Sequence, residues 1–381
     1  MRDHDYFFSK GMILVLLISI QLNSHSVEAN ISQISFTEIS SISAEPGSQI
    51  VDVQVIGNVL FVVDAFMGLL TYNITNPANP SLLGSYYDHY TFTHSVLIEE
   101  NYAYVSDLED GLEIIDISDP SDINIIGDYT SNVGPTAGST DAHKSGDLAF
   151  LASQNMGLEI INCSNPYNPV IIGSYYDNER VIRVYALNNH VFISEAGNGF
   201  KILNITGSGC IESFHYQDSV SYQDFFVLDD LLYTTDRNFG FRIFDIKNFT
   251  DIIQIGGIDI GDSYGFVVTR EEENKIAYVT TWESGLKILN ITEPENVQIL
   301  GQYNDGGDDY NVAVKGDLIF VAEFHDGLEI LQIKTINNGV SPRKSSIIPG
   351  FELYTLLLGF SQLALYTIII KNNKFRKDKV V

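Results

Sequence analysis

The stretch Gly111-Leu-Glu-Ile-Ile-Asp-Ile-Ser-Asp-Pro120 contains the pattern that decides the fold, because close variants of it recur along the chain. Its first residue has six equivalents, at intervals of 41 to 46 residues. The seven marker glycines are Gly68, Gly111, Gly157, Gly199, Gly240, Gly285 and Gly327. Seven units of this length are typical of a β-propeller, in which four-stranded blades surround a channel.

The positions around each marker glycine indicate that every unit is built from strands. An aromatic residue stands seven positions before each glycine, and Leu or Phe follows each glycine directly. Segments such as residues 59–63 and 148–152 are short and apolar, as strands are when both faces are buried. The glycine should close a hairpin loop, where a positive φ costs little only for glycine. In four units an Asn-Pro, Asp-Pro or Glu-Pro pair then ends the next strand.

The seventh unit lacks a fourth strand after residue 333. Residues 34–42 alternate apolar and polar side chains and precede the first complete unit. This segment should pair with the last blade and close the ring, which removes two exposed sheet edges. The predicted fold is therefore an all-β, seven-bladed propeller over residues 30–333, with four-stranded blades and a ring closed by the N-terminal strand, followed by one C-terminal transmembrane helix.

The two ends of the chain carry targeting signals. Residues 1–29 combine basic residues, a short apolar run and a small-residue site at Val27-Glu28-Ala29, which predicts a cleaved signal peptide. Residues 334–347 form a polar linker, and residues 348–370 are long and apolar enough to span a membrane. The basic residues of the tail, 371–381, should stay in the cytoplasm, which places the propeller outside the cell.

Charge limits the choice of partner. Residues 30–333 contain 44 acidic and 11 basic residues, a formal charge near −33. Such a surface repels nucleic acid and anionic lipid, and it suits cationic ligands, divalent metals or high salt. With only Cys163 and Cys210, no disulfide framework is expected, and Cys163 occupies a position that holds Ile in the other units.

The repeat units resemble LVIVD repeats. The resemblance rests on Asn101-Tyr-Ala-Tyr-Val-Ser-Asp107 and on Gly285-Leu-Lys-Ile-Leu-Asn-Ile-Thr-Glu-Pro294, besides the stretch quoted first. It extends over residues 44–333 and is weakest in units 4 and 5, and it implies a propeller of prokaryotic surface proteins without established catalytic residues. Pro349, Gly350 and Phe351, with the apolar span and basic tail, resemble archaeal sorting segments of the Pro-Gly-Phe type, which implies either a retained anchor or a processed tail.

Acidic residues stand four positions before the marker glycine in five units, at Asp64, Asp107, Glu195, Asp236 and Glu323. Two interpretations remain open. The residues stabilise their hairpin loops through backbone hydrogen bonds, which the sequence favours, or they hold a cation such as Ca²⁺ together with the loop at 305–309. No other cofactor is expected.

Six Asn-x-Ser/Thr sequons are present, and four of them share one blade position, where Asp116 and Asp245 stand in two other units. Turn chemistry therefore explains this motif without glycosylation. Histidines 89, 94, 143 and 215 are expected in or near connecting loops, and their spacing matches no metal motif.

Variable inter-blade connections are the expected working part of the molecule, because binding residues gather on loops held by a rigid scaffold. The candidate ligand face consists of Tyr90, Phe92, Asp305, Asp308 and Asp309. No nucleophile elbow, zinc-protease motif or phosphate loop is present. The sequence thus favours a membrane-tethered extracellular binding or scaffold module for a protein, glycan or small ligand. A hydrolase-like surface enzyme with a dispersed site and a structural envelope component are the alternatives.

Overall fold

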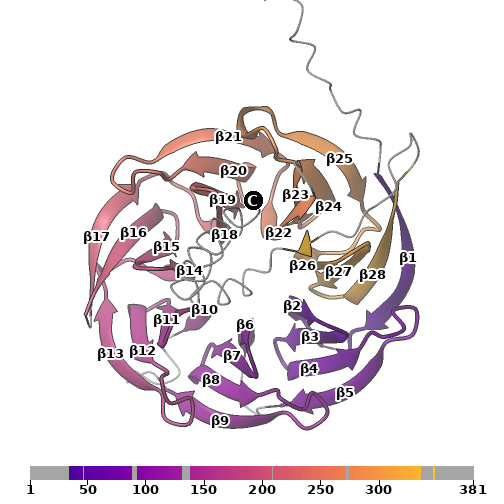
Figure 1. Ribbon diagram of the computed structural model, residues 1–381, viewed down its shortest axis with the longest axis horizontal. Helices are drawn as coiled ribbons and strands as arrows, with labels where there is room; N and C mark the ends of the chain where they lie inside the picture. The colour runs from indigo at the N-terminus through magenta and orange to yellow at the C-terminus, as the bar shows by residue number, and fades with distance from the viewer. Residues whose placement is uncertain are drawn as a thin grey trace, which may run out of the picture.

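The computed structural model describes residues 34–335, apart from 46, 88–91, 131–137, 208 and 272–273, together with residues 346–347. In this part of the chain the strands form seven antiparallel sheets around a central channel, which confirms the seven-bladed propeller (Figure 1). Each blade contributes its first strand to the channel wall and its last strand to the rim.

The first three blades follow the chain order from the channel outward. Blade 1 contains β2 (Ile50–Ile56), β3 (Val59–Asp64), β4 (Gly68–Asn73) and β5 (Ser81–Tyr86). Blade 2 contains β6 (Thr93–Glu99), β7 (Tyr102–Asp107), β8 (Gly111–Asp116) and β9 (Asn124–Tyr129). Blade 3 contains β10 (Ser139–Ser145), β11 (Leu148–Ser153), β12 (Gly157–Asn162) and β13 (Val170–Tyr175).

The remaining blades repeat this arrangement. Blade 4 contains β14 (Val181–Leu187), β15 (His190–Glu195), β16 (Gly199–Thr206) and β17 (Gly209–Tyr216). Blade 5 contains β18 (Tyr222–Leu228), β19 (Leu231–Asp236), β20 (Gly240–Asp245) and β21 (Ile253–Asp259). Blade 6 contains β22 (Ser263–Glu271), β23 (Asn274–Thr281), β24 (Gly285–Asn290) and β25 (Gln298–Tyr303). Blade 7 contains β26 (Asp309–Lys315), β27 (Leu318–Glu323) and β28 (Gly327–Thr335).

The N-terminal strand β1 (Ile34–Ser43) supplies the fourth strand of blade 7. It pairs antiparallel with β28, from Ile34 opposite Thr335 to Ser43 opposite Gly327. The two strands lie side by side at the rim although about 290 residues separate them in sequence (Figure 1). The closure predicted from residues 34–42 is therefore confirmed.

All seven marker glycines have positive φ, between +73° and +113°. Each begins the third strand of its blade, and at five of them, Gly68, Gly157, Gly199, Gly285 and Gly327, a Cβ would collide with a carbonyl oxygen of the neighbouring strand. At Gly285, for example, a Cβ would lie 2.2 Å from the carbonyl oxygen of Tyr303. The conserved spacing of the glycines is thus a steric requirement of the hairpin.

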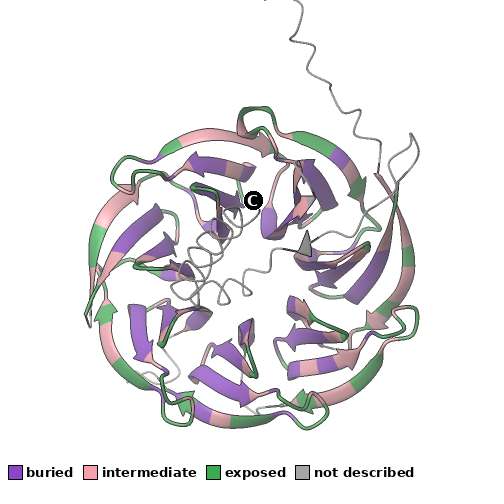
Figure 2. Cartoon of the chain, in the orientation of Figure 1, coloured by how far each residue is buried: buried purple, intermediate pink, exposed green. Residues whose placement is uncertain are grey.

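The core consists of the apolar faces of neighbouring blades, packed against each other (Figure 2). The aromatic residues seven positions before the marker glycines all lie in it, with at most 3% of their surface exposed. Burying each such side chain contributes about 2 to 3 kcal/mol, so this position alone holds adjacent blades together strongly.

Blade 6 departs from the expected four strands. A short fifth strand, β29 (Ser346–Ile347), pairs with β22 opposite Thr269 and Arg270, within the segment predicted to be a linker. Both strands of this hairpin are longer than their equivalents in blade 1, with nine residues in β22 and eight in β23, and β29 pairs with the added end of β22.

The predicted membrane helix at 348–370 and the signal peptide lie outside the described residues. Within the part that is described, no helix combines the length and the apolar character needed to cross a membrane.

Candidate functional site

A cavity of about 720 Å³ occupies the channel and is lined by the first strands of the blades. In every blade this strand contains a β-bulge near its start, where the register with the second strand shifts. A bulge re-aims the side chain that follows it. The residues at this position, here termed the channel ring, are Asp52, Ser95, Asp141, Arg183, Asp224, Gly265 and Asn311.

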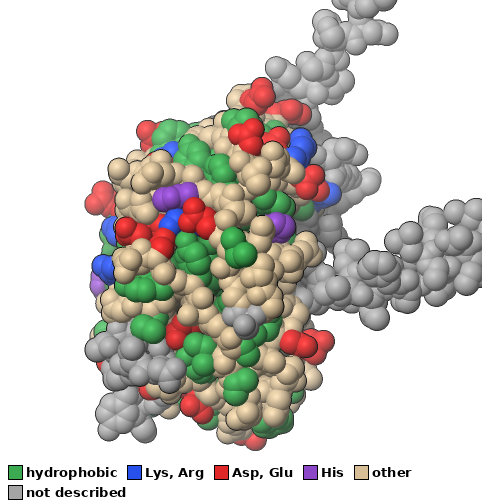
Figure 3. Space-filling view, turned by 90° about the vertical axis from the view of Figure 1, so that its left-hand side faces the viewer, with side chains coloured by type: hydrophobic (Ala, Val, Ile, Leu, Met, Phe, Trp, Pro, Cys, Tyr) green, Lys and Arg blue, Asp and Glu red, His purple; other side chains and the backbone are tan. Residues whose placement is uncertain are grey.

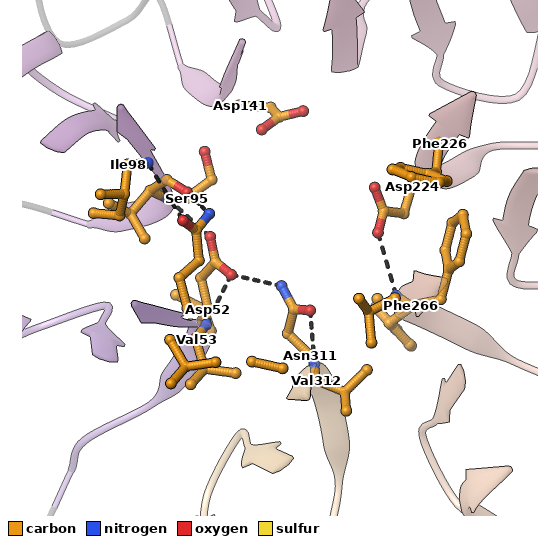
Figure 4. Close-up of a pocket in the computed structure, with 18 of the residues that line it drawn as sticks. Asp52, Val53, Ser95, Ile98, Asp141, Asp224, Phe226, Phe266, Asn311 and Val312 are labelled. Atoms are coloured by element: carbon orange, nitrogen blue, oxygen red, sulfur yellow. Dashed lines mark hydrogen bonds between the residues drawn. The ribbon is translucent and has the colours of Figure 1, made fainter. Parts of the chain in front are cut away.

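Side chains of the channel ring connect neighbouring blades. Asp52 accepts hydrogen bonds from the backbone N–H of Val53 in its own strand, at 2.7 Å, and of Val96 in blade 2, at 2.8 Å. Asp141 and Asp224 repeat this bridge with the N–H groups of blades 4 and 6. Figure 4 shows the three carboxylates entering one space from three blades.

The other ring members make related bridges. Asn311 donates from Nδ2 to Asp52 Oδ1 at 2.7 Å, joining blade 7 to blade 1 (Figure 4). Gly265 leaves room for Asn311, because a Cβ at Gly265 would lie 2.4 Å from the Asn311 side-chain oxygen. Arg183 donates from Nε to the carbonyl of Gln223 in blade 5 at 2.6 Å.

Burial dominates the electrostatics of the ring. It raises the pKa of Asp52 and of Asp224 to about 7, and it also raises the pKa of Asp141. Burial alone would lower the pKa of Arg183, but Tyr310, Asp141 and Asp224 around the guanidinium outweigh it and hold that pKa above its ordinary value. The single arginine therefore compensates part of the negative charge in the channel.

Three of the four histidines lie in strands. His94 is the second residue of β6 and His215 the last but one of β17, so both are next to inter-blade connections, whereas His143 lies within β10. Burial lowers the pKa of His94 and of His143 to about 4, and both are therefore neutral at physiological pH. His89 lies outside the described residues.

These contacts define what the channel can do chemically. The ring carboxylates already accept backbone hydrogen bonds on both sides, which assigns them to holding the blades in place.

Aromatic side chains gather where the channel opens on one side of the ring. We term this side the connecting face, because it carries the inter-blade connections and the hairpin loops that precede the marker glycines. The opposite side carries the Asx-Pro turns and is termed the turn face. The aromatic cluster consists of Tyr264, Trp282, Tyr310 and Phe324, whose rings contact one another at centroid distances of 4.9 to 6.4 Å. Tyr264 and Tyr310 line the cavity, whereas Trp282 and Phe324 belong to hairpin loops.

The surroundings of the aromatic cluster are mixed in character. The guanidinium of Arg237 lies 5.2 Å from the ring centroid of Tyr264 and pairs with Asp262 at 3.1 Å. Tyr310 and Phe324 also pack against the core cluster of blades 1 and 2. On the connecting face of these two blades, Phe66 and Phe92 are exposed and contact each other at 4.5 Å.

The residues proposed from sequence as a ligand face have different surroundings. Phe92 is 38% exposed and Asp305 is exposed, whereas Asp308 is half-buried and bonded to His325 at 2.9 Å. Asp309 is only 2% exposed, so it is not a surface group. Tyr90 and the sorting motif Pro349, Gly350 and Phe351 lie outside the described residues.

The acidic residues before the marker glycines divide into two groups. Asp64, Asp107 and Asp236 each accept two backbone N–H bonds within their own hairpin loops, as the turn interpretation predicts. Glu195 instead pairs with Lys201 at 2.9 Å, and Glu323 makes neither contact within the described chain.

The sequon position proves to be a turn position. Asn73, Asn162 and Asn290 accept the backbone N–H two residues ahead, and Asp116 and Asp245 do the same in their blades. Cys163 is buried and Cys210 half-buried, and neither forms a disulfide.

Sequence reasoning missed both the channel ring and the aromatic cluster. A signal for the ring existed in the sequence, because six of its members stand 16 residues before their marker glycines: Asp52, Ser95, Asp141, Arg183, Asp224 and Asn311. The longer hairpin of blade 6 shifts Gly265 away from that offset. Nothing in the sequence groups the four rings of the cluster, which come from four separate strands and loops.

Four segments of the chain, residues 49–88, 92–131, 139–177 and 306–341, match the LVIVD repeat. The matches cover blades 1, 2 and 3 and most of blade 7, so they are less extensive than the resemblance noted from sequence, which extended over residues 44–333. A sequence comparison with characterised proteins finds no match.

Solved propellers are similar in fold. A virginiamycin B lyase from Staphylococcus aureus aligns with a TM-score of 0.61 at 12% identity, covering 79% of this chain and 99% of the lyase. BamB from Moraxella catarrhalis aligns with a TM-score of 0.54 at 13% identity, covering 80% and 100%. The WD40 domain of Neurospora crassa Pan2 aligns with a TM-score of 0.61 at 9% identity, covering 82% and 98%. At these identities the similarity is one of fold alone.

Proposed function

We propose that this chain is a surface-held binding module that docks a protein partner on its connecting face. The aromatic cluster at the channel mouth is the observation that carries the proposal. Hairpin loops of blades 6 and 7 contribute Trp282 and Phe324, both of which remain only partly buried. Such aromatic side chains, rigid and partly desolvated, are the usual anchors of protein interfaces.

Charge favours a partner with a basic segment next to its apolar anchor. The formal charge near −33 over residues 30–333 attracts cations at long range and speeds their association. On the side of the ring drawn in Figure 3, acidic side chains outnumber basic ones among uncharged residues. Near the aromatic cluster, Asp262, Glu283 and Asp326 supply carboxylates for such contacts.

The turn face supports the proposal by contrast. Its loops are the uniform Asx turns, whose side chains bond to their own backbone. The connecting face combines the most varied loops with the aromatic cluster, and binding residues are expected on varied loops above a rigid scaffold. The channel carboxylates are occupied by inter-blade bonds, which favours a binding role over the hydrolase-like alternative.

Capture from the cell envelope tests the proposal. The full chain is used as bait in parallel with Trp282→Ala, and Tyr167→Ala serves as control, because Tyr167 is a 61% exposed aromatic residue on the turn face. We expect the Trp282→Ala change to weaken binding of the recovered protein at least about tenfold, as for an interface anchor. The control should bind like the parent. Equal binding by Trp282→Ala and the parent, or recovery of a glycan without protein, contradicts the proposal.

The proposal places the propeller outside the cell, tethered through residues 348–370 after removal of residues 1–29. Its support is the apolar span followed by the basic tail. Mass spectrometry of the envelope fraction distinguishes the two forms of attachment. Peptides beyond Phe351 indicate a retained anchor, whereas their absence with a modified C-terminus indicates sorting at Pro349, Gly350 and Phe351. Full-length protein found in the soluble cytoplasmic fraction contradicts both.

A further inference from the structure

Blade 7 lacks a positive charge that two other blades provide at the same place. The residue four positions before the marker glycine and the residue two positions after it lie on adjacent strands, near the connecting face. In blade 4 they are Glu195 and Lys201, with Lys201 Nζ 2.9 Å from Glu195 Oε1. In blade 5 they are Asp236 and Arg242, with Arg242 Nε 2.6 Å from Asp236 Oδ2. Both acids are completely buried, and each is neutralised by its own blade.

Blade 7 has an acidic residue at both positions, Glu323 and Glu329. They are 3% and 6% exposed, so water does not compensate their charge. Asp305, from the connection between blades 6 and 7, joins them, and one carboxylate oxygen from each of the three residues lies within 4.8 Å of the others. None of the three forms an ion pair with a lysine or arginine among the described residues.

Several oxygens of this group have no hydrogen-bond partner. Glu323 Oε1 and Glu329 Oε2 are inaccessible to solvent and unpaired, and so is Oδ2 of the adjacent Asp309. A buried carboxylate oxygen without a donor is costly, and native proteins satisfy such oxygens with a hydrogen bond, a water or an ion. Unpaired oxygens directed into one small space therefore point to a ligand there.

The loop before β26 is shaped to bring its backbone against these carboxylates. A Cβ at Gly307 would lie 2.8 Å from Oε1 of Glu323, so glycine lets the loop backbone approach this carboxylate closely. Gly306 adopts a φ of +105°, and the N–H of Gly307 donates to Asp305 Oδ1 at 3.1 Å. The loop thereby holds the Asp305 carboxylate at the open side of the group.

Burial and mutual proximity determine the electrostatics of this group. Burial first, and then the neighbouring carboxylates, raise the pKa of Glu323 and of Glu329.

We propose that Asp305, Glu323 and Glu329 bind a divalent cation, and that calcium is the ion they suit. The donors are all carboxylate oxygens, without histidine or cysteine, which favours a hard cation over zinc. Calcium accepts six to eight oxygens in irregular arrangements at about 2.3 to 2.6 Å, whereas magnesium demands a regular octahedron at about 2.0 to 2.1 Å. Two oxygens on opposite sides of a calcium ion are therefore about 5 Å apart. The carboxylate oxygens of Asp305, Glu323 and Glu329 lie within 4.8 Å of one another and so fit around such an ion.

This inference goes beyond the proposed docking role and does not depend on it. The site lies in the hairpin of β27 and β28, and Phe324 of the aromatic cluster follows Glu323 directly. Calcium would hold this hairpin in one conformation whether or not a partner docks there.

The test measures calcium chloride binding to the purified full chain, stripped with a chelator, by isothermal titration calorimetry and thermal unfolding. We expect one calcium per chain and a rise in Tm of about 5 °C at a calcium concentration 100 times the Kd. Magnesium chloride should bind at least about tenfold more weakly. The absence of both binding heat and a Tm shift up to millimolar calcium overturns the proposal.

Three variants assign the binding to this site. Glu329→Lys recreates the acid and lysine pair of blade 4, so we expect it to remain folded without calcium and to lose the calcium response. Asp305→Asn alters only an exposed loop residue and should weaken calcium binding at least about tenfold. Glu159→Gln is the matched control, because Glu159 holds the equivalent position in blade 3 and already receives bonds from Tyr129 and Ser153. Undiminished binding in both Glu329→Lys and Asp305→Asn, or loss of binding in Glu159→Gln alone, overturns the assignment.

Discussion

At the scale of single residues, the marker glycines show how a repeat pattern arises from one steric requirement. Each stands where a hairpin meets the third strand of its blade with positive φ, and at five of them, Gly285 included, a carbonyl oxygen fills the space that a Cβ would occupy. Either feature alone costs a non-glycine residue free energy, and together they leave little choice of side chain.

Substitution of a marker glycine should therefore destabilise the fold more than substitution of a turn glycine. We expect Gly285→Ala to lower the free energy of unfolding by about 2 to 4 kcal/mol, through both the left-handed backbone and the collision with Tyr303. Gly146→Ala is the control, because its φ is +59° but no atom lies within 4 Å of the added Cβ, and it should cost about 1 kcal/mol. Urea unfolding measures both, and equal losses would refute the steric account.

The buried aspartates of the channel ring predict a dependence of stability on pH. Burial raises the pKa of Asp52 and of Asp224 from 3.8 to about 7, so between these values the folded state holds protons that the unfolded chain has released. The stabilisation is complete below pH 3.8 and is lost as the pH rises through 7. The pKa values of Asp309, Glu323 and Glu329 in blade 7 are also raised, so these residues change stability with pH in the same direction.

We therefore expect the free energy of unfolding to fall between pH 5 and pH 8, with calcium absent. Replacing Asp224 by Asn should remove a slope on the order of 1 kcal/mol per pH unit, because the amide does not titrate. Replacing the exposed Asp119 by Asn should leave the slope unchanged. A parent stability that is level or rises over this range is inconsistent with buried, protonated aspartates.

At the scale of the elements, the short strand β1 determines whether the ring of blades closes. It completes blade 7 by pairing along the whole of β28. Without it, β28 exposes a row of unpaired backbone groups at the rim, and blade 7 loses the strand that ties the two ends of the propeller together.

Deletion of residues 30–43 should consequently lower the Tm markedly or cause association through the exposed edge of β28. The comparison is a chain that lacks only residues 1–29 and keeps β1. Sedimentation velocity and thermal unfolding report the two effects. A deleted chain that stays monomeric with an unchanged Tm would show that β1 does not close the ring.

The sequence predicted the elements more completely than the sites. Strand order, closure by residues 34–42 and the marker glycines all follow from short-range patterns, because each blade repeats the same local chemistry. The channel ring depends on β-bulges that bring one residue per blade together, and blade 6 breaks its register by four extra residues. The aromatic cluster depends on contacts between blades, which no pattern within a single repeat reveals. The sequence placed Glu323 and the loop at 305–309 in one possible cation site but did not single out Glu329.

At the scale of the whole molecule, the two sides of the propeller have different chemistry. The turn face repeats one self-bonded turn, whereas the connecting face carries the aromatic cluster, the exposed pair Phe66 and Phe92, and the carboxylates of blade 7. The channel ring makes the scaffold between them rigid, since each of its bridges ties one blade to the next. A rigid ring with one varied face is suited to presenting a fixed binding surface.

Hydrogen–deuterium exchange of the propeller with and without the partner recovered from the envelope tests the central claim most directly. The account predicts slowed exchange in the hairpin loops at residues 282–284 and 324–326, with unchanged exchange in the Asx-Pro turns at residues 75–80 and 164–169. Slowed exchange confined to those turns would place the partner on the opposite side of the ring and contradict the account.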